Sequence, residues 1–294
     1  MPGNAALAKS GLNSTVTASP RTFLHLVQQV LPVRLAEFRS LRVVPLATLI
    51  ALAACNVDSV TDPLAPPSDA SFKRQPPPPP PPPPPPVVPY THTPILFVHG
   101  YNGSSSTWTT MVSRFSTDGY AAGELVNFTY DYTKSNRTTA QLIKTKVDSM
   151  LALHPEVSKV NIITHSMGTI SVRYYIDSLG GSPKVHAFAG LGATNHGTSL
   201  AAFLFTTAGI EMRPNSTLLN HLNATDESPF GVGYSTWRSP CDEAVSPHDS
   251  PILQGLIPNL ENNVLTACMS HSQLHEDPTV YAQVKSFIET FLAP

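Results

Sequence analysis

The sequence is short of charge, of cysteine and of long hydrophobic runs, and each shortage excludes a class of protein. Charged residues make up 13% of the 294 residues and hydrophobic residues 41%, which excludes a highly charged disordered chain. Three cysteines are too few for a disulfide scaffold or a structural zinc cluster. No apolar run reaches the roughly 18 to 20 residues of a membrane-spanning helix. The net charge of -2 lacks the basic excess of nucleic-acid-binding proteins, so no nucleic-acid partner is expected.

The N-terminus is typical of an export signal. Residues 1–54 hold five basic residues and one acidic residue, and they end in an apolar run over 43–54. A basic stretch, an apolar run and small residues follow each other in a secretory signal. The final Leu52-Ala-Ala-Cys55 resembles the lipobox of bacterial lipoproteins, which implies lipidation of Cys55 and a membrane anchor. An ordinary export signal with a chance cysteine is the alternative.

A proline-rich linker without periodicity is predicted over residues 55–89. Its run of 11 prolines predicts a polyproline II rod, about 34 Å long at about 3.1 Å per residue. Such a rod would space a domain from a membrane or wall, and a proline-rich ligand for a partner domain is the less favoured alternative. The folded domain is therefore expected over residues 90–294, and we expect it to be a monomer.

Strand and helix patterns alternate along this domain. The apolar run over 94–98 is typical of a strand buried on both faces of a parallel sheet. Further strands are predicted over 124–130, 160–164, 185–191, 233–237 and 263–267. Apolar residues spaced three and four apart predict helices over 142–151 and 280–291, and Asp277-Pro278 is a start signal for the second. The alternation predicts an α/β fold with a mainly parallel sheet.

A serine stands at a sharp turn between a strand and a helix. The turn reads Thr164-His-Ser166-Met-Gly168, with the predicted helix over 169–179. This is the context of a nucleophile elbow, which holds a serine on a strained turn above the sheet edge. The usual pattern is Gly-x-Ser-x-Gly, and Thr164 replaces its first glycine. We predict that Ser166 is a nucleophile for acyl transfer rather than a polar surface residue.

Acyl transfer also needs hydrogen-bond donors aimed at the developing oxyanion. In this kind of site one backbone N–H comes from the residue after the nucleophile and one from the loop after the first strand. That rule assigns the N–H groups of Met167 and of Tyr101, which lies in His99-Gly-Tyr-Asn-Gly103. An ordinary glycine turn is the alternative for this loop.

The acid and the base are expected after the last two predicted strands, because the chain order is nucleophile, acid, histidine. Asp242 and His271 occupy these places. His271 is predicted to take the serine proton as general base, and Asp242 to orient it and stabilise the imidazolium. Glu243 and Asp249 remain alternative acids, and His275 an alternative histidine.

Two cysteines lie beside the predicted acid and base. An exported protein permits a disulfide between Cys241 and Cys268, which would tie the acid loop to the base loop. By reducing the entropy of the unfolded chain, such a bridge would stabilise the folded state by about 3 to 4 kcal/mol. The alternative is two unrelated buried thiols.

At these residues the domain resembles the small bacterial lipases of the class 2 lipase family, within the α/β-hydrolase fold. The resemblance spans about residues 93–292 and rests on Phe97-Val-His-Gly-Tyr-Asn-Gly103, His165-Ser-Met-Gly168 continuing through Arg173-Tyr-Tyr-Ile176, Leu191-Gly-Ala-Thr-Asn-His-Gly-Thr198, Asp242 and His271-Ser-Gln-Leu274. It implies hydrolysis of lipid esters, with no cofactor and no metal.

Residues 199–232 are longer than in the smallest members of that family. The apolar run Leu200–Phe205, with Ile210 and Met212, is open to three interpretations: an acyl pocket, a mobile lid, or core packing of an extra helix. Low charge and this apolar insertion favour acylglycerols as substrates. The alternatives are a short-chain carboxylesterase or polyester depolymerase and, outside enzymes, a surface-anchored binding module on an inactive hydrolase fold.

Overall fold

The computed structural model describes residues 89–290, apart from residues 225, 230 and 256–259. The predicted export segment 1–54, the lipidation residue Cys55 and the linker up to residue 88 lie outside the described residues. Within the described part, no helix combines the length and the apolar character needed to cross a membrane.

Six strands form one sheet in which every neighbouring pair is parallel, in the order β2-β1-β3-β4-β5-β6. They are β1 (Ile95–Val98), β2 (Leu125–Asn127), β3 (Val160–His165), β4 (Val185–Leu191), β5 (Gly233–Arg238) and β6 (Leu260–Leu265). The predicted α/β fold with a parallel sheet is confirmed. Since all strands run the same way, the loops after them meet at one edge.

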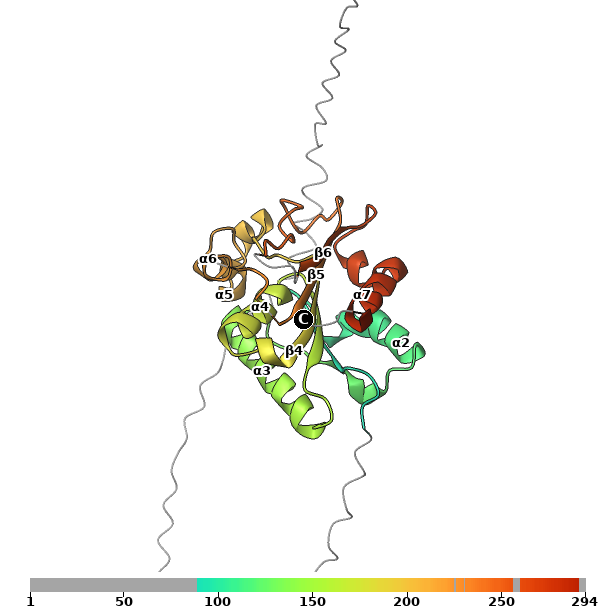
Figure 1. The fold of residues 1–294 in the computed structure, drawn as a ribbon. Helices are drawn as coiled ribbons and strands as arrows, with labels where there is room; N and C mark the ends of the chain where they lie inside the picture. Colours follow the sequence, from blue (N-terminus) through green and yellow to red (C-terminus); the bar gives the residue numbers. More distant parts are fainter. Residues whose placement is uncertain (1–88, 225, 230, 256–259, 291–294) are drawn as a thin grey trace, which may run out of the picture. The chain divides into compact units, whose positions relative to one another are not determined.

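Helices cover both faces of the sheet. The longer ones are α2 (Thr109–Thr117), α3 (Asn136–Leu153), α4 (Gly168–Ser178) and α7 (Pro278–Thr290). The shorter ones are η1 (Ser105–Trp108), η2 (Ala122–Glu124), η3 (Ser182–Lys184), η4 (Ser199–Phe203), α5 (Thr207–Glu211), α6 (Thr217–Leu222) and η5 (Ser272–His275). In Figure 1, α3 and α4 lie on one face of the sheet and α2 and α7 on the other.

Two hydrophobic cores result from this layering, because alternate residues of a strand point to opposite faces. In β1, Leu96 and Val98 pack with α3 and α4, whereas Ile95 and Phe97 pack with α2 and α7. All four side chains are fully buried, which is why the run reads as continuously apolar.

The start of α7 is as predicted, and the strands that differ most from their predicted ranges are β2 and β6. The N–H groups of Thr279 and Val280 donate to Asp277 Oδ1 at 2.7 and 3.0 Å, so Asp277 caps this helix. The strand β2 ends at Asn127, three residues before the predicted 130. Tyr130 bonds His99 instead: its N–H donates to Nε2 and its hydroxyl donates to the carbonyl oxygen. The last strand, β6, begins three residues before the predicted 263.

Glu124 anchors the chain where it enters β1. Its buried carboxylate accepts hydrogen bonds from the N–H groups of Thr91, His92 (2.8 Å) and Ala121 (2.8 Å). Burial alone would raise the pKa of Glu124, but these hydrogen bonds outweigh burial and lower the pKa to about 2. The carboxylate therefore stays ionised and fixes the amino end of the central strands.

Candidate active site

The predicted site residues come from loops that follow four different strands. Ser166 follows β3, the loop His99–Gly103 follows β1, Asp242 follows β5 and His271 follows β6. All four loops lie at the carboxyl edge of the sheet, where α/β proteins place their binding sites.

Ser166 lies on a strained turn, with a φ of 55° in the left-handed region that side chains rarely adopt. Its N–H donates to the carbonyl oxygen of Leu191 at 2.9 Å, and α4 begins two residues later. A nucleophile elbow needs this conformation to lift its hydroxyl above the sheet edge. The local geometry is therefore that of an elbow, although Thr164 stands where a glycine is usual.

Two glycines make room for this turn. A Cβ on Gly168 would lie 2.6 Å from Thr164 Oγ1 and 2.9 Å from the Val98 carbonyl oxygen. A Cβ on Gly100 would lie 2.7 Å from Ser166 Cβ. Side chains cannot fit at these distances, so the close approach of strand, turn and helix requires glycine at both positions.

The predicted acid and base are in contact. His271 Nδ1 donates to Asp242 Oδ2 at 2.8 Å, and Asp242 Oδ1 accepts from the N–H groups of Ala244 and Val245, both at 2.9 Å. Asp242 is 3% exposed. Because the ionised carboxylate only accepts, the proton of a neutral His271 lies on Nδ1 and Nε2 keeps a free lone pair. This is the tautomer that a general base requires.

Ser166 and His271 both contact the Leu191–Gly192 turn. Leu191 holds the Ser166 N–H, and the His271 ring lies over Gly192, where a Cβ would come within 3.0 Å of its Cε1. Within the described part of the chain, no hydrogen bond joins the Ser166 hydroxyl to His271. Catalytic hydrogen bonds are often long without substrate and shorten in the reacting complex.

The predicted oxyanion donors are the backbone N–H groups of Tyr101 and Met167. Neither the Tyr101 N–H nor the Met167 N–H donates to another described residue. His99 stabilises the loop that carries Tyr101, because its Nδ1 donates to the Gly100 carbonyl oxygen at 2.8 Å. Burial lowers the pKa of His99, so it stays neutral and its Nε2 accepts from the Tyr130 N–H at 3.3 Å. No sequence pattern pointed to this supporting role of His99.

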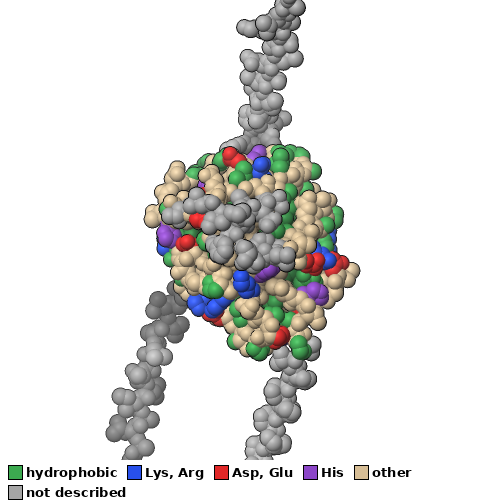
Figure 2. All heavy atoms as spheres, viewed as in Figure 1, with side chains coloured by type: hydrophobic (Ala, Val, Ile, Leu, Met, Phe, Trp, Pro, Cys, Tyr) green, Lys and Arg blue, Asp and Glu red, His purple; other side chains and the backbone are tan. Residues whose placement is uncertain are grey.

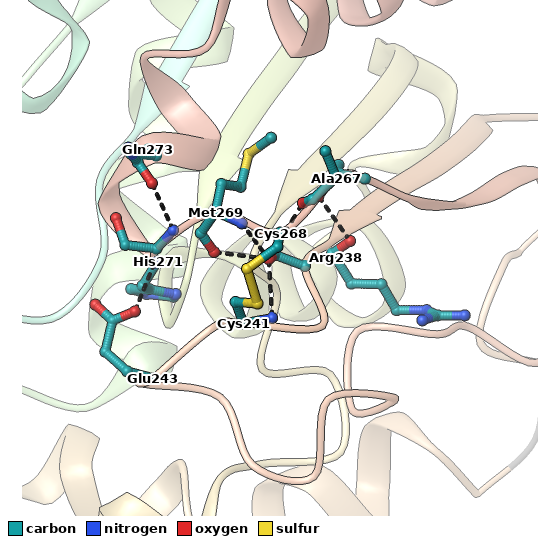
Figure 3. The surroundings of a disulfide bond; sticks show 11 residues. Arg238, Cys241, Glu243, Ala267, Cys268, Met269, His271 and Gln273 are labelled. Carbon is teal, nitrogen blue, oxygen red and sulfur yellow. Dashed lines mark hydrogen bonds between the residues drawn. A yellow bond between two sulfur atoms is a disulfide. The ribbon is translucent and has the colours of Figure 1, made fainter.

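A disulfide joins Cys241 to Cys268, which confirms the predicted pairing, and its Cα atoms are 5.0 Å apart. Both cysteines are exposed rather than buried. Ser239 reinforces the link, because its hydroxyl donates to the Met269 carbonyl oxygen at 2.6 Å and accepts from the Met269 N–H at 2.9 Å. Figure 3 shows the bridge between the acid loop and the base loop.

Among the described residues, neither the alternative acids nor the alternative histidine forms the acid–base pair. Glu243 is exposed and accepts from the backbone N–H of His271 at 3.0 Å, not from its ring. Asp249 is exposed, with no contact to a histidine ring within the described residues. His275 is buried with its ring 4.8 Å from the ring of His165. The geometry therefore favours Asp242 and His271 as the pair.

The apolar segment after β4 forms part core and part rim. Ala201, Ala208 and Met212 are buried in the core, whereas Phe203 and Phe205 are 67% and 82% exposed. Thr206 Oγ1 donates to the hydroxyl of Tyr101 at 3.3 Å, which places this segment beside the predicted oxyanion loop.

The same segment is fastened to the domain. The Arg213 guanidinium donates to the carbonyl oxygens of Ala201 at 3.1 Å and Leu204 at 2.8 Å. Glu211, the only charged residue from 199 to 212, is turned inward and accepts from Ser135 and Asn136. The outer surface of the segment is therefore uncharged and its backbone is held at both ends.

Residues of the 191–198 stretch bind the loops together. The buried Arg173 donates to the carbonyl oxygens of Asn195 (3.3 Å) and Leu222 (2.9 Å). Thr198 Oγ1 donates to the Ala244 carbonyl oxygen at 2.8 Å and so ties the loop after β4 to the acid loop. These are structural roles that the sequence pattern alone did not distinguish from catalytic ones.

In the described part of the chain, no three His, Cys, Asp or Glu side chains lie together as metal ligands. What converges instead is a serine at an elbow, a histidine and a buried aspartate at one edge of a parallel sheet. A fold and a site of this form define an α/β hydrolase.

The chain belongs to the family described as lipase (class 2), which it matches over residues 92–285. Among solved structures, the mature lipase BlEst2 of Bacillus licheniformis is similar at 17% identity and a TM-score of 0.56, with 69% of this chain and 96% of that chain covered. Lipase B of Aspergillus fumigatus is similar at 14% identity and a TM-score of 0.55, with 67% and 52% covered. The chain thus spans about half the length of the second. These likenesses show the α/β-hydrolase fold, and with the family they make the protein a hydrolase of the lipase and esterase kind.

Proposed function

We propose that the protein hydrolyses the ester bonds of acylglycerols through an acyl-enzyme on Ser166. The Asp242–His271 hydrogen bond beside the strained Ser166 turn is the observation that carries this proposal. His271 Nε2 takes the serine proton as Oγ attacks the ester carbonyl, and Asp242 stabilises the imidazolium. The N–H groups of Tyr101 and Met167 receive the oxyanion.

The tetrahedral intermediate then expels the alcohol, which takes its proton from His271. Water, deprotonated by the same Nε2, attacks the acyl-enzyme and releases the fatty acid and free Ser166. The atoms balance with water as the only co-substrate.

The apolar rim supports a fatty-acyl substrate. Phe203, Phe205 and the 46% exposed Ile210 lie on the segment that bonds Tyr101, and this segment presents no charge outward. Exposed apolar groups of this size mark surfaces that bind apolar partners. Charged side chains are scattered over the face drawn in Figure 2.

A fluorophosphonate probe tests the nucleophile. The wild type is expected to be labelled and to hydrolyse p-nitrophenyl esters, and Ser166→Ala to do neither. Ser113→Ala is the matched control, because Ser113 is an exposed serine on α2, a helix that carries none of the predicted site residues. Full labelling of Ser166→Ala would reject Ser166, and an unlabelled wild type would revive the binding module.

A series of p-nitrophenyl esters from acetate to palmitate, with an emulsified triacylglycerol, tests the substrate. Activity is expected to rise with chain length and to include the emulsion. A sharp optimum at acetate with no release of fatty acid from the emulsion would instead identify a short-chain esterase.

Export and anchoring form a separate part of the proposal. The disulfide supports export, because such bonds persist in oxidising compartments outside the cytosol. Lipidation of Cys55 stays a prediction, and the mass of the mature N-terminal peptide tests it. A peptide with an unmodified Cys55 would rule out the anchor.

A further inference from the structure

The loop that carries His271 is held at its backbone as well as at its ring. The His271 carbonyl oxygen accepts from Nε2 of His165 at 3.1 Å, and the His271 N–H donates to Glu243 Oε2 at 3.0 Å. The second bond is drawn beside the disulfide in Figure 3. Neither bond involves the ring atoms that would exchange protons during the proposed reaction.

His165 links the base directly to the nucleophile, because it is the last residue of β3 and precedes Ser166. Its buried ring lies 4.3 Å from the ring of His271. Since a carbonyl oxygen only accepts, Nε2 of His165 carries the proton. Burial, followed by the His271 and His275 rings, lowers the pKa of His165 well below its usual value, so the ring stays neutral.

Glu243 holds the same residue from the acid loop. It follows Asp242 directly, so two consecutive carboxylates bond His271. Asp242 accepts from the ring and Glu243 from the backbone N–H. Glu243 is exposed, and its contribution to folding is expected to be small.

These backbone bonds matter because the residue packed against the His271 imidazole is a glycine. The ring rests over Gly192, which offers no side chain to hold it. The position of the ring is therefore set by Asp242, by the His165 ring 4.3 Å away and by the backbone of His271. A displacement of about 1 Å at a catalytic group can cost about 10²-fold in rate.

We propose that His165 and Glu243 are positioning residues that hold the backbone of His271 in register with Ser166. The proposal rests on the proposed function of Ser166 and His271. It assigns a role to the residue before the nucleophile and to an exposed acid that bonds the backbone of the base.

Glu243 gives the first test, with a soluble ester such as p-nitrophenyl butyrate. Glu243→Ala is expected to lower kcat about 10-fold and leave KM unchanged, because the variant loses orientation rather than substrate binding. Glu243→Gln keeps a carbonyl oxygen for the His271 N–H and should recover most of the lost kcat. Asp249→Ala is the matched control, since it removes an exposed carboxylate of the same loop that does not contact His271.

His165 gives the second test. His165→Leu removes the donor and is expected to lower kcat and the rate of fluorophosphonate labelling by about 10- to 100-fold at unchanged KM. His165→Gln places an amide N–H near the position of Nε2 and should restore at least half of the loss on a logarithmic scale. Urea unfolding of each variant identifies those that are folded. If His165→Leu is not folded, the positioning proposal is tested by the Glu243 variants alone.

The outcomes separate the two proposals. If Ser166→Ala is inactive while Glu243→Ala and folded His165→Leu keep kcat within twofold of wild type, the positioning proposal is wrong and the proposed function stands. If Glu243→Ala raises KM at unchanged kcat, or His165→Gln is as impaired as His165→Leu, positioning through these bonds is also rejected. If Ser166→Ala remains active, the proposed function itself fails.

Discussion

Replacing both Cys241 and Cys268 with serine should destabilise the domain strongly. The bridge closes a loop between positions 27 apart. Loop entropy for that length corresponds to about 3.5 kcal/mol at 25 °C. For a domain of about 200 residues, each kcal/mol is worth about 2 to 4 °C, so Tm should fall by about 7 to 14 °C.

Activity at 25 °C should fall much less than stability. Ser239 joins the same two loops through its bonds to Met269, and Asp242 still bonds His271. These contacts do not depend on the sulfur atoms. We therefore expect kcat/KM of the folded double variant to lie within about tenfold of wild type.

Urea unfolding followed by tryptophan fluorescence measures the loss, because Trp108 and Trp237 are both buried. Cys55→Ser is the control that removes a cysteine without touching the bridge. A loss of unfolding free energy below about 1 kcal/mol would refute the loop-entropy reasoning. Inactivity of the folded double variant, equal to that of Ser166→Ala, would refute the role given to the Ser239 contacts.

Three other changes test separate parts of the structure. Asp242→Asn should leave Tm nearly unchanged and lower kcat by ~10⁴-fold, as expected when a base histidine loses its tautomer, and steady-state kinetics checks this. Gly168→Ala should lower the free energy of unfolding in urea by about 1 to 3 kcal/mol or more, because its Cβ would strike the atoms around the elbow. Gly123→Ala is the control: its Cβ would meet only the Tyr90 side chain, at 3.4 and 3.9 Å, and should cost less than about 1 kcal/mol. Glu124 has a folded pKa of about 2 against an ordinary value of 4.5, so its stabilisation is complete above pH 4.5 and is lost as the pH falls towards 2. Glu124→Gln should lower the unfolding free energy at pH 7 by about 2 to 3 kcal/mol and flatten this acid loss, and a wild-type stability equal at pH 5 and pH 2 would contradict it.

Local patterns predicted much of the fold. The fully buried β1 read as an apolar run, and the Asp277-Pro278 signal placed the start of α7. The helix α2 was not predicted, because its Thr- and Ser-rich sequence resembles a loop. Its apolar residues Met111, Val112 and Phe115 do recur at the three- and four-residue spacing of a helix, and Met111 and Phe115 are buried against β1.

The candidate site was predicted by chain order and turn context, and its supporting contacts were not. The strand–turn–helix context pointed to Ser166, and the ends of later strands pointed to Asp242 and His271. The bonds that Glu243 and His165 make to the His271 backbone join residues 28 and 106 positions apart. Such contacts depend on how the loops pack together, and the sequence shows only that the side chains exist.

The hydrogen bonds from Thr91 and His92 to Glu124 fix the point at which the chain enters the domain. The chain enters at the amino end of β1. Ser166 and His271 follow the carboxyl ends of β3 and β6, which lie at the opposite edge of the sheet. Within the domain, the chain therefore enters at one edge of the sheet, and an ester substrate of the proposed reaction would approach at the other.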